Sequence, residues 1–199
     1  MSFVPKAWNE FPEGNRRQTA SLTKGMVTKM KNHIQMNKIE FAIGDFYERD
    51  SVKSRNEFFL TKDRSLLYQS TSNGDYSILL DGNWRFELIV DSSTGLCIKF
   101  QSLLDELKVI HKPLALPESK ARRVLIKTDE MLFSGEGCHY HPFLNKVYWD
   151  ERKKILCIGN PESIGEAIEF TPHIIMVLKS HQLHCLYLNL NNVPGIDFL

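Results

Sequence analysis

Short runs of residues that are apolar, or that alternate between apolar and polar, recur from Asn37 to the end of the chain. Successive side chains of a strand point to opposite faces, so this period of two predicts strands rather than helices. Turn residues such as Ser72-Asn73-Gly74-Asp75 separate the runs and favour hairpins. The predicted strands are Glu57–Thr61, Ser65–Gln69, Tyr76–Leu80, Trp84–Val90, Leu96–Phe100, Arg123–Lys127, Lys146–Trp149, Lys154–Ile158, Ala167–Phe170, His173–Leu178 and Leu183–Leu190.

Helix is scarce in this pattern. The best helical candidate is Gln101–Lys108, where three leucines are spaced to share one helix face. A weaker helical turn is predicted at Pro117–Ala121. Pro113 and Pro117 also predict that His111–Ser119 is an extended connection between two halves of the chain.

One hairpin template recurs in order along the chain. The segments EFFLTKDRSLLYQS and KVYWDERKKILCIG each contain an aromatic strand, a charged turn and an apolar strand. Farther along, FELIVDSSTGLCIKFQ matches HIIMVLKSHQLHCLYLN, which aligns Cys97 with Cys185 and Leu96 with His184. The copies keep a nearly constant separation, which favours a structural duplication over two unrelated hairpins.

These patterns predict a mainly β fold, with antiparallel hairpins in two related halves that form a sandwich or an open barrel with one or two short helices. Residues 37–112 are the first half and residues 113–199 the second, packed as one globular unit. Residues 1–36 mix Pro, Gly, Asn and basic residues without sustained periodicity. We therefore expect an N-terminal extension there, either ordered or disordered.

The region of about residues 146–190 resembles a family of short bacterial β-rich domains of unknown function. The shared pattern is Tyr148-Trp149-Asp150 at a turn, the apolar strand Ile155–Ile158, the acidic strand Glu166–Phe170 and a closing hairpin from Leu183 to Leu190. The chain departs from it where Lys179-Ser180-His181-Gln182 replaces a turn with glycine. The resemblance implies a bacterial β module, duplicated over about residues 57–103, and supplies no activity.

Charge and hydropathy argue against several classes of partner. The 25 basic residues nearly balance the 24 acidic residues, so no strong positive field would attract nucleic acid. The longest apolar run, Ile174–Leu178, is far shorter than the roughly 18 residues that a membrane helix needs. The N-terminus also lacks the apolar region of a secretory signal. We therefore expect a cytoplasmic protein whose four cysteines are free thiols.

The segment Gly135–Pro142 is the densest candidate for chemistry, with a thiol, two histidines and a carboxylate. On an extended backbone His139 and His141 would share one face. With Cys138 and His184 they offer the nitrogen and sulfur donors that suit zinc. The chain has no established zinc-binding spacing, so a zinc site is the alternative and the absence of a cofactor is the preferred hypothesis.

A thiol enzyme is a second form of this alternative. Cys138 would be the nucleophile, His139 or His141 the base, and Glu136 the group that orients the base. Neighbouring side chains on a strand point apart, which disfavours this arrangement. The sequence also contains no GxGxxG, Walker or GxSxG motif, so an enzyme is not the favoured class.

Aromatic and charged residues beside one hairpin tip favour protein recognition. Tyr148, Trp149, Asp150 and Arg152 lie together there, and such residues are common at interfaces. The alternative is that Trp149 belongs to the core and the charges provide solubility. The preferred hypothesis is a non-catalytic bacterial protein that binds another protein, specifically a toxin-neutralising immunity protein. Pairing of exposed sheet edges into a homo-oligomer is a further alternative.

Overall fold

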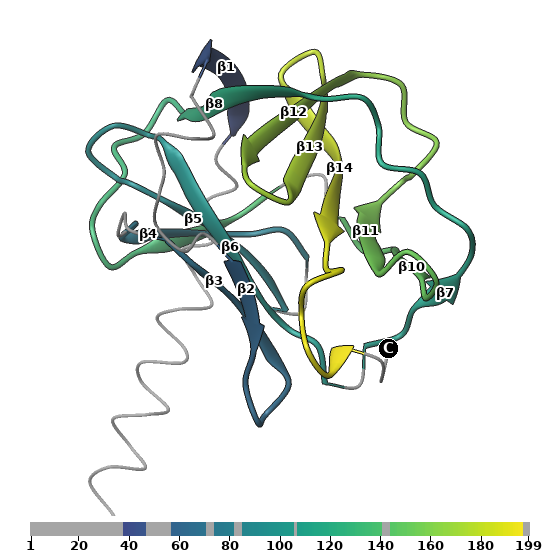
Figure 1. Ribbon diagram of the computed structural model, residues 1–199. Helices are drawn as coiled ribbons and strands as arrows, with labels where there is room; N and C mark the ends of the chain where they lie inside the picture. Colours follow the sequence, from purple (N-terminus) through teal and green to yellow (C-terminus); the bar gives the residue numbers. More distant parts are fainter. Residues whose placement is uncertain are drawn as a thin grey trace, which may run out of the picture. The chain divides into compact units, whose positions relative to one another are not determined.

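The computed structural model describes residues 38–46, 57–70, 74–81, 85–105, 107–140 and 144–196, and short apolar or alternating segments form strands along most of them. The strands of these residues lie in two sheets (Figure 1). The eight-stranded sheet contains, in spatial order, β1 (Glu40–Phe46), β8 (Lys120–Lys127), β12 (Glu166–Thr171), β13 (Ile174–Lys179), β14 (Gln182–Asn189), β11 (Ile155–Gly159), β10 (Val147–Asp150) and β7 (Ile110–His111). The six-stranded sheet contains β2 (Glu57–Leu60), β3 (Ser65–Gln69), β6 (Cys97–Leu103), β5 (Phe86–Val90), β4 (Tyr76–Leu79) and β9 (Gly137–His139).

Both sheets are mixed, although antiparallel pairs predominate. Parallel pairs join β10 to β7 and β12 to β8 in the eight-stranded sheet, and β4 to β9 in the six-stranded sheet. The predicted mainly β fold is confirmed. The parallel pairs did not form part of that prediction, because they join strands that are far apart in the sequence and leave no hairpin signal.

The prediction of a helix at Gln101–Lys108 is wrong. Residues up to Leu103 continue β6, where Ser102 pairs with Phe86 of β5 and with Leu66 of β3. Strands on both sides satisfy the backbone of this segment. These pairings outweigh the helical spacing of its leucines, because local propensity is weak compared with tertiary pairing.

The weaker helical turn predicted at Pro117–Ala121 is also wrong. Residues 117–119 have no regular secondary structure, and β8 begins at Lys120. Lys120 pairs with Ile168 of β12, so the chain needs an extended backbone at this point.

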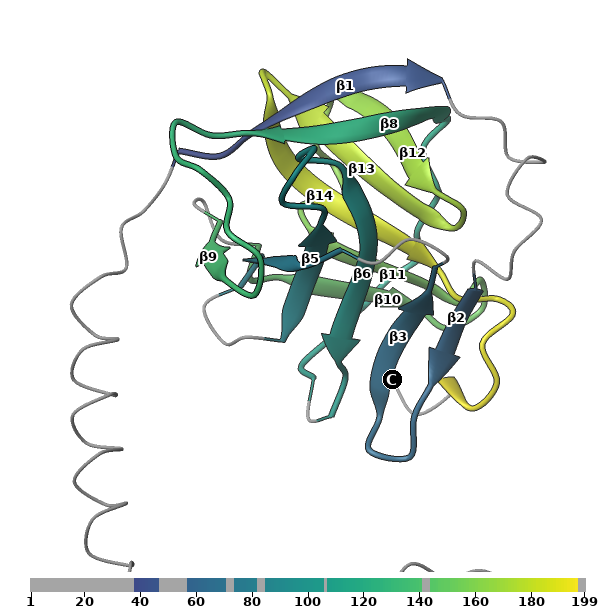
Figure 2. The ribbon, with the colours of Figure 1, turned by 90° about the vertical axis from the view of Figure 1, so that its left-hand side faces the viewer.

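The two sheets share one apolar core. Leu66 and Phe100 enter it from the six-stranded sheet, and Leu156 and Leu186 enter it from the eight-stranded sheet; all four are completely buried. Figure 2 shows strands of the six-stranded sheet side by side, with β10 and β11 passing behind them. The sheets therefore pack across this core as the two layers of a sandwich.

Two buried tyrosines connect the sheets by hydrogen bonds. The hydroxyl of Tyr140, which follows β9, donates to the Leu183 carbonyl (3.2 Å) and accepts from the Leu183 amide (2.7 Å). The hydroxyl of Tyr68 on β3 lies 2.8 Å from Thr171 Oγ1 and donates to the Pro172 carbonyl (3.1 Å). Burial raises the pKa of both tyrosines to about 12, so both hydroxyls stay protonated.

Replacing Tyr140 with phenylalanine is expected to lower the free energy of unfolding by about 2 kcal/mol, because the buried backbone of Leu183 loses its hydroxyl partner. Urea unfolding followed by tryptophan fluorescence measures this change. Tyr148→Phe is the matched control, since the Tyr148 hydroxyl has no hydrogen bond to the described residues. Equal losses in the two variants would contradict the role of Tyr140 in joining the sheets.

The second face of the eight-stranded sheet is covered by residues 112–119, which we call the strap. The strap joins β7 to β8, which lie near opposite edges of the eight-stranded sheet. It therefore crosses the strands between them (Figure 1). Its Leu114 and Leu116 pack on a second buried cluster. This cluster also contains Ile155, Cys157, Ala167, Ile175, Val177, Cys185 and Tyr187.

The two sheets have one strand order in common. The order β2-β3-β6-β5-β4-β9 corresponds to β10-β11-β14-β13-β12-β8, and each order ends on a parallel pair. Each sheet also has a register shift at the corresponding place, after Ile89 on β5 and after Val177 on β13. In this shared register Cys185 corresponds to Lys99, so the sequence alignment of Cys185 with Cys97 does not match the strand pairing.

The predicted boundary between residues 112 and 113 does not separate the sheets. Strands β1 and β7 from the first half pair in the eight-stranded sheet, and β9 from the second half pairs in the six-stranded sheet. The extension predicted for residues 1–36 lies outside the described residues. Within the described ranges, no helix has the length and apolar character of a membrane span.

Candidate functional site

The outer face of the six-stranded sheet carries apolar side chains at the surface. Phe59 of β2 pairs with Leu67 of β3, and Leu67 pairs with Gln101 of β6, so these side chains form a row across three strands. Phe59 is 43% exposed, and Leu103 on β6 is 44% exposed. We call Phe59, Leu67, Lys99, Gln101 and Leu103 the open face.

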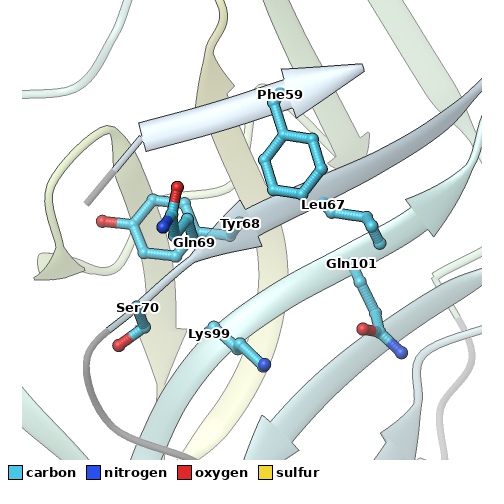
Figure 3. A pocket seen from close by; sticks show the side chains of 7 residues that line it. All are labelled: Phe59, Leu67, Tyr68, Gln69, Ser70, Lys99 and Gln101. Carbon is cyan, nitrogen blue, oxygen red and sulfur yellow. The ribbon is translucent and has the colours of Figure 1, made fainter. Parts of the chain in front are cut away.

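A shallow hollow of ≈ 360 Å³ lies on the open face (Figure 3). Its lining side chains come from β2, β3 and β6 and from the residue after β3: Phe59, Leu67, Tyr68, Gln69, Ser70, Lys99 and Gln101. Phe59 and Leu67 project from neighbouring strands, and Lys99 and Gln101 project from β6. The hollow therefore has an apolar side and a polar side.

Lys99 supplies the charge of the hollow. Gln101 donates a hydrogen bond from Nε2 to Glu87 Oε2 on β5, and Glu87 forms no ion pair with a described residue. Lys99 is paired in register with Ile89, and no described side chain forms an ion pair with its ammonium group. This ammonium group is thus available for a carboxylate from another molecule.

The open face has a counterpart beneath the strap. In the shared register Phe59, Leu67, Lys99 and Gln101 correspond to Tyr148, Cys157, Cys185 and Tyr187. All four counterparts belong to, or pack against, the cluster that the strap covers. One sheet face is therefore filled by the chain's own strap, whereas the corresponding place on the other sheet is a hollow.

The residues of the predicted zinc site are spread over both sheets. Cys138 and His139 lie on β9 in the six-stranded sheet, and His184 lies on β14 in the eight-stranded sheet. His141 lies outside the described residues. In the described part of the chain, no group of three His, Cys, Asp or Glu side chains could hold a metal ion. The zinc site stays a prediction, which elemental analysis of untagged protein purified without chelator would test.

The environment of Cys138 favours a protonated thiol. Cys138 packs against the shared core, and burial raises the pKa of its thiol. The thiol also has a hydrogen bond to Tyr76. Because Cys138 and His139 are neighbours on a strand, their side chains point to opposite faces. The structure therefore does not bring this predicted nucleophile and His139 together on one face.

Cys138 is expected to react with iodoacetamide more slowly at neutral pH in the folded protein than in the urea-unfolded protein. Only the thiolate reacts, and a raised pKa leaves little thiolate at pH values below the ordinary thiol pKa of about 8.5. Peptide mass mapping of timed samples measures the rate. Fast alkylation of the folded protein at neutral pH would contradict this result and favour the thiol-enzyme hypothesis.

The predicted partner-binding residues are divided between the interior and the surface. Trp149 is 1% exposed and Asp150 is 5% exposed. Tyr148 is half-buried, and Arg152 is exposed. Of this set, therefore, Tyr148 and Arg152 offer side-chain surface to a partner in this structure.

Asp150 fixes the strap to the turn between β10 and β11. Its carboxylate accepts hydrogen bonds from the amides of Leu114 (2.7 Å), Arg152 (3.1 Å) and Lys153 (3.1 Å). Lys153 Nζ in turn donates to the Leu114 carbonyl (2.7 Å). These amide hydrogen bonds, with that of Leu114 the strongest cause, hold the pKa of Asp150 below its usual value. The carboxylate of Asp150 thus has a structural role.

Asp150→Asn is expected to destabilise the protein near neutral pH and to have little effect at acid pH. The folded-state pKa of Asp150 is depressed, so its carboxylate stabilises the fold above an unfolded pKa of about 4. This stabilisation is lost as the pH falls through the folded-state pKa. Urea unfolding of both proteins across this range measures the difference. A difference that stays constant into the acid range would contradict the expectation.

Sequence reasoning did not identify the open face, although one signal for it was present. Phe58 and Phe59 are adjacent on β2, so one aromatic ring must point to each face of the sheet. The structure buries Phe58 in the core at 7% exposure and leaves Phe59 at the surface. A pair of adjacent aromatics in a short strand therefore marks a sheet with apolar side chains on both faces.

Comparisons with known proteins do not assign the chain to a family. No family model matches the chain, and no curated protein sequence matches it. The function is therefore inferred from the geometry and chemistry of the described residues.

Proposed function

We propose that this protein acts by binding another protein through the open face. The observation that carries the proposal is the exposure of Phe59 and Leu103 on the outer face of the six-stranded sheet. The strap covers the corresponding face of the eight-stranded sheet. Leu67 lies between them in the strand order and lines the hollow. An exposed apolar patch on a regular sheet face is typical of an interaction site.

The composition of the open face agrees with that of a protein interface. Interfaces combine an aromatic or aliphatic centre with a polar rim, and aromatic residues contribute much of the binding energy. Phe59 and Leu67 provide the apolar centre. Lys99 and Gln101 provide polar groups beside it. The sheet positions these side chains on a rigid backbone, which lowers the entropic cost of association.

We also propose that the two sheets represent two related halves of a duplicated unit. The shared strand order and the matching register shifts support this relation. Under this proposal the open face and the covered face derive from one ancestral surface. The covered face kept an apolar composition beneath the strap, while Lys99 and Gln101 stand on the open face where Cys185 and Tyr187 stand on the covered one.

The narrower form of the proposal is a toxin-neutralising immunity protein of the bacterial cytoplasm. Its support is the resemblance of about residues 146–190 to bacterial β-rich domains and the compact β architecture. In this form the partner is a toxin, which the open face would hold in an inactive complex.

Affinity capture with matched variants tests the proposal. The full chain, Phe59→Thr and Ile164→Thr are immobilised and exposed to a lysate of the source organism. Ile164 is 87% exposed in the loop between β11 and β12, so it controls for the loss of a surface apolar side chain. We expect a protein that the full chain and Ile164→Thr retain and that Phe59→Thr loses. Equal retention by all three would contradict the proposal.

A further inference from the structure

We infer that the open face takes an extended segment of its partner, which places an apolar side chain between Phe59 and Leu67 and a carboxylate at Lys99. This inference rests on the proposed function and defines the binding mode. It differs from a contact with a folded surface, because one short peptide would carry the recognition.

The chain contains an intramolecular template for such binding. The strap is an extended segment without regular secondary structure that lies on the covered sheet face. Leu114 is 4% exposed there, and its backbone is held on both sides by Asp150 and Lys153. This fold therefore packs an extended, leucine-containing segment on a sheet face.

The hollow lies where the template has its contacts. Phe59 and Leu67 occupy the register positions of Tyr148 and Cys157, which pack beneath the strap. An apolar side chain of a partner segment at this place would meet two apolar neighbours, as Leu114 and Leu116 do on the covered face. Burial of this side chain would contribute to the affinity of the segment, because apolar surface is removed from water.

The charge of Lys99 on the open face, which has no counterpart on the covered face, predicts a negative charge on the partner. Lys99 stands in the register position of Cys185, a completely buried thiol. A partner segment that covers the hollow would remove Lys99 from water, which costs free energy unless an opposite charge accompanies the segment. Glu87 on the neighbouring strand accepts a hydrogen bond from Gln101, and no described carboxylate forms an ion pair with Lys99. A carboxylate of the partner segment at Lys99 would supply the opposite charge.

Selection of peptides from a random 12-residue display library tests the inference. The immobilised full chain is expected to enrich peptides with a large aliphatic residue and an acidic residue at a fixed spacing. When the Lys99→Glu variant is the immobilised target, the enriched peptides should carry a basic residue in place of the acidic one, because the charge of the hollow is reversed. Enrichment of peptides without this charge reversal, or no enrichment, would overturn the inference.

The affinity of one selected peptide, synthesised and titrated, locates its site. We expect Phe59→Thr to weaken binding by at least about 30-fold, the effect of losing an interface hot spot. Lys99→Met should weaken it by about 5-fold or more and should reduce its salt dependence. Ile164→Thr should leave the affinity unchanged. Equal affinity for the full chain and Phe59→Thr would overturn the inference.

Two other results separate this inference from the proposed function. A partner captured through Phe59 in the absence of any selectable peptide would leave the proposed function supported and overturn the extended segment. A second copy of this chain is the other occupant to consider. Sedimentation of a dimer that Phe59→Thr dissociates would identify that copy as the occupant and would overturn the inference.

Discussion

Replacing Gly159 with alanine is expected to destabilise the protein by about 3 kcal/mol or more. Gly159 has a φ of +103°, which side chains rarely adopt, and an added Cβ would lie 2.4 Å from the His184 carbonyl oxygen. It would also lie 2.9 Å from the Cys185 Cα on the paired strand. Both contacts are with backbone, so neither can be relieved by a side-chain rotation. Urea unfolding followed by tryptophan fluorescence measures the loss.

Gly135→Ala is the matched control for this prediction. Gly135 also has a positive φ, +79°, but an added Cβ would meet no atom within 4 Å. The control therefore carries the conformational cost alone, about 1 kcal/mol, without the steric contacts. If the two variants lost equal stability, the close approach of β11 to β14 at Gly159 would be contradicted.

Replacing Leu114 with alanine is expected to cost about 3 kcal/mol, the usual result for a buried leucine that leaves a cavity. Leu114 is the buried leucine of the strap, and it packs in the second buried cluster, on the covered face of the eight-stranded sheet. The loosened strap should also expose Cys157 and Cys185, which are completely buried in the structure. Urea unfolding measures the first effect, and the rate of thiol alkylation below the unfolding transition measures the second.

Leu116→Ala gives the internal comparison for the strap. Leu116 is half-buried, so its loss should cost less than that of Leu114. A Leu114→Ala variant with unchanged stability and unchanged thiol protection would show that the strap does not hold the covered face closed.

Much of the strand pattern could be predicted from sequence, because short apolar or alternating segments end at turn residues. β5 and β13 are apolar-rich examples, and the structure buries alternate residues of each in the shared core. The end of β6 was wrongly predicted to be helical. Its leucines fit a helix equally well, and pairing with the distant strands β3 and β5 decides its conformation. Such pairings depend on residues that local patterns do not connect.

The candidate site was less accessible to sequence reasoning. Trp149 and Asp150 stand beside a charged turn, a context shared by surface and interior residues. Trp149 is buried in the core that the two sheets share, and Asp150 is buried where its carboxylate accepts a hydrogen bond from the Leu114 amide of the strap. Conversely, Phe59 resembled any other strand aromatic. Whether a sheet face is covered depends on where a distant connection crosses, and this is a tertiary property.

Hydrogen exchange of the full chain, with and without the captured partner, tests the open face most directly. If the partner binds there, amides of β2, β3 and β6 should gain protection on complex formation. The turn at Glu151–Lys153, beside the partner-binding set predicted from sequence, should exchange as it does in the free protein. Protection confined to that turn and to Tyr148, with unchanged exchange in β2, β3 and β6, would contradict the account.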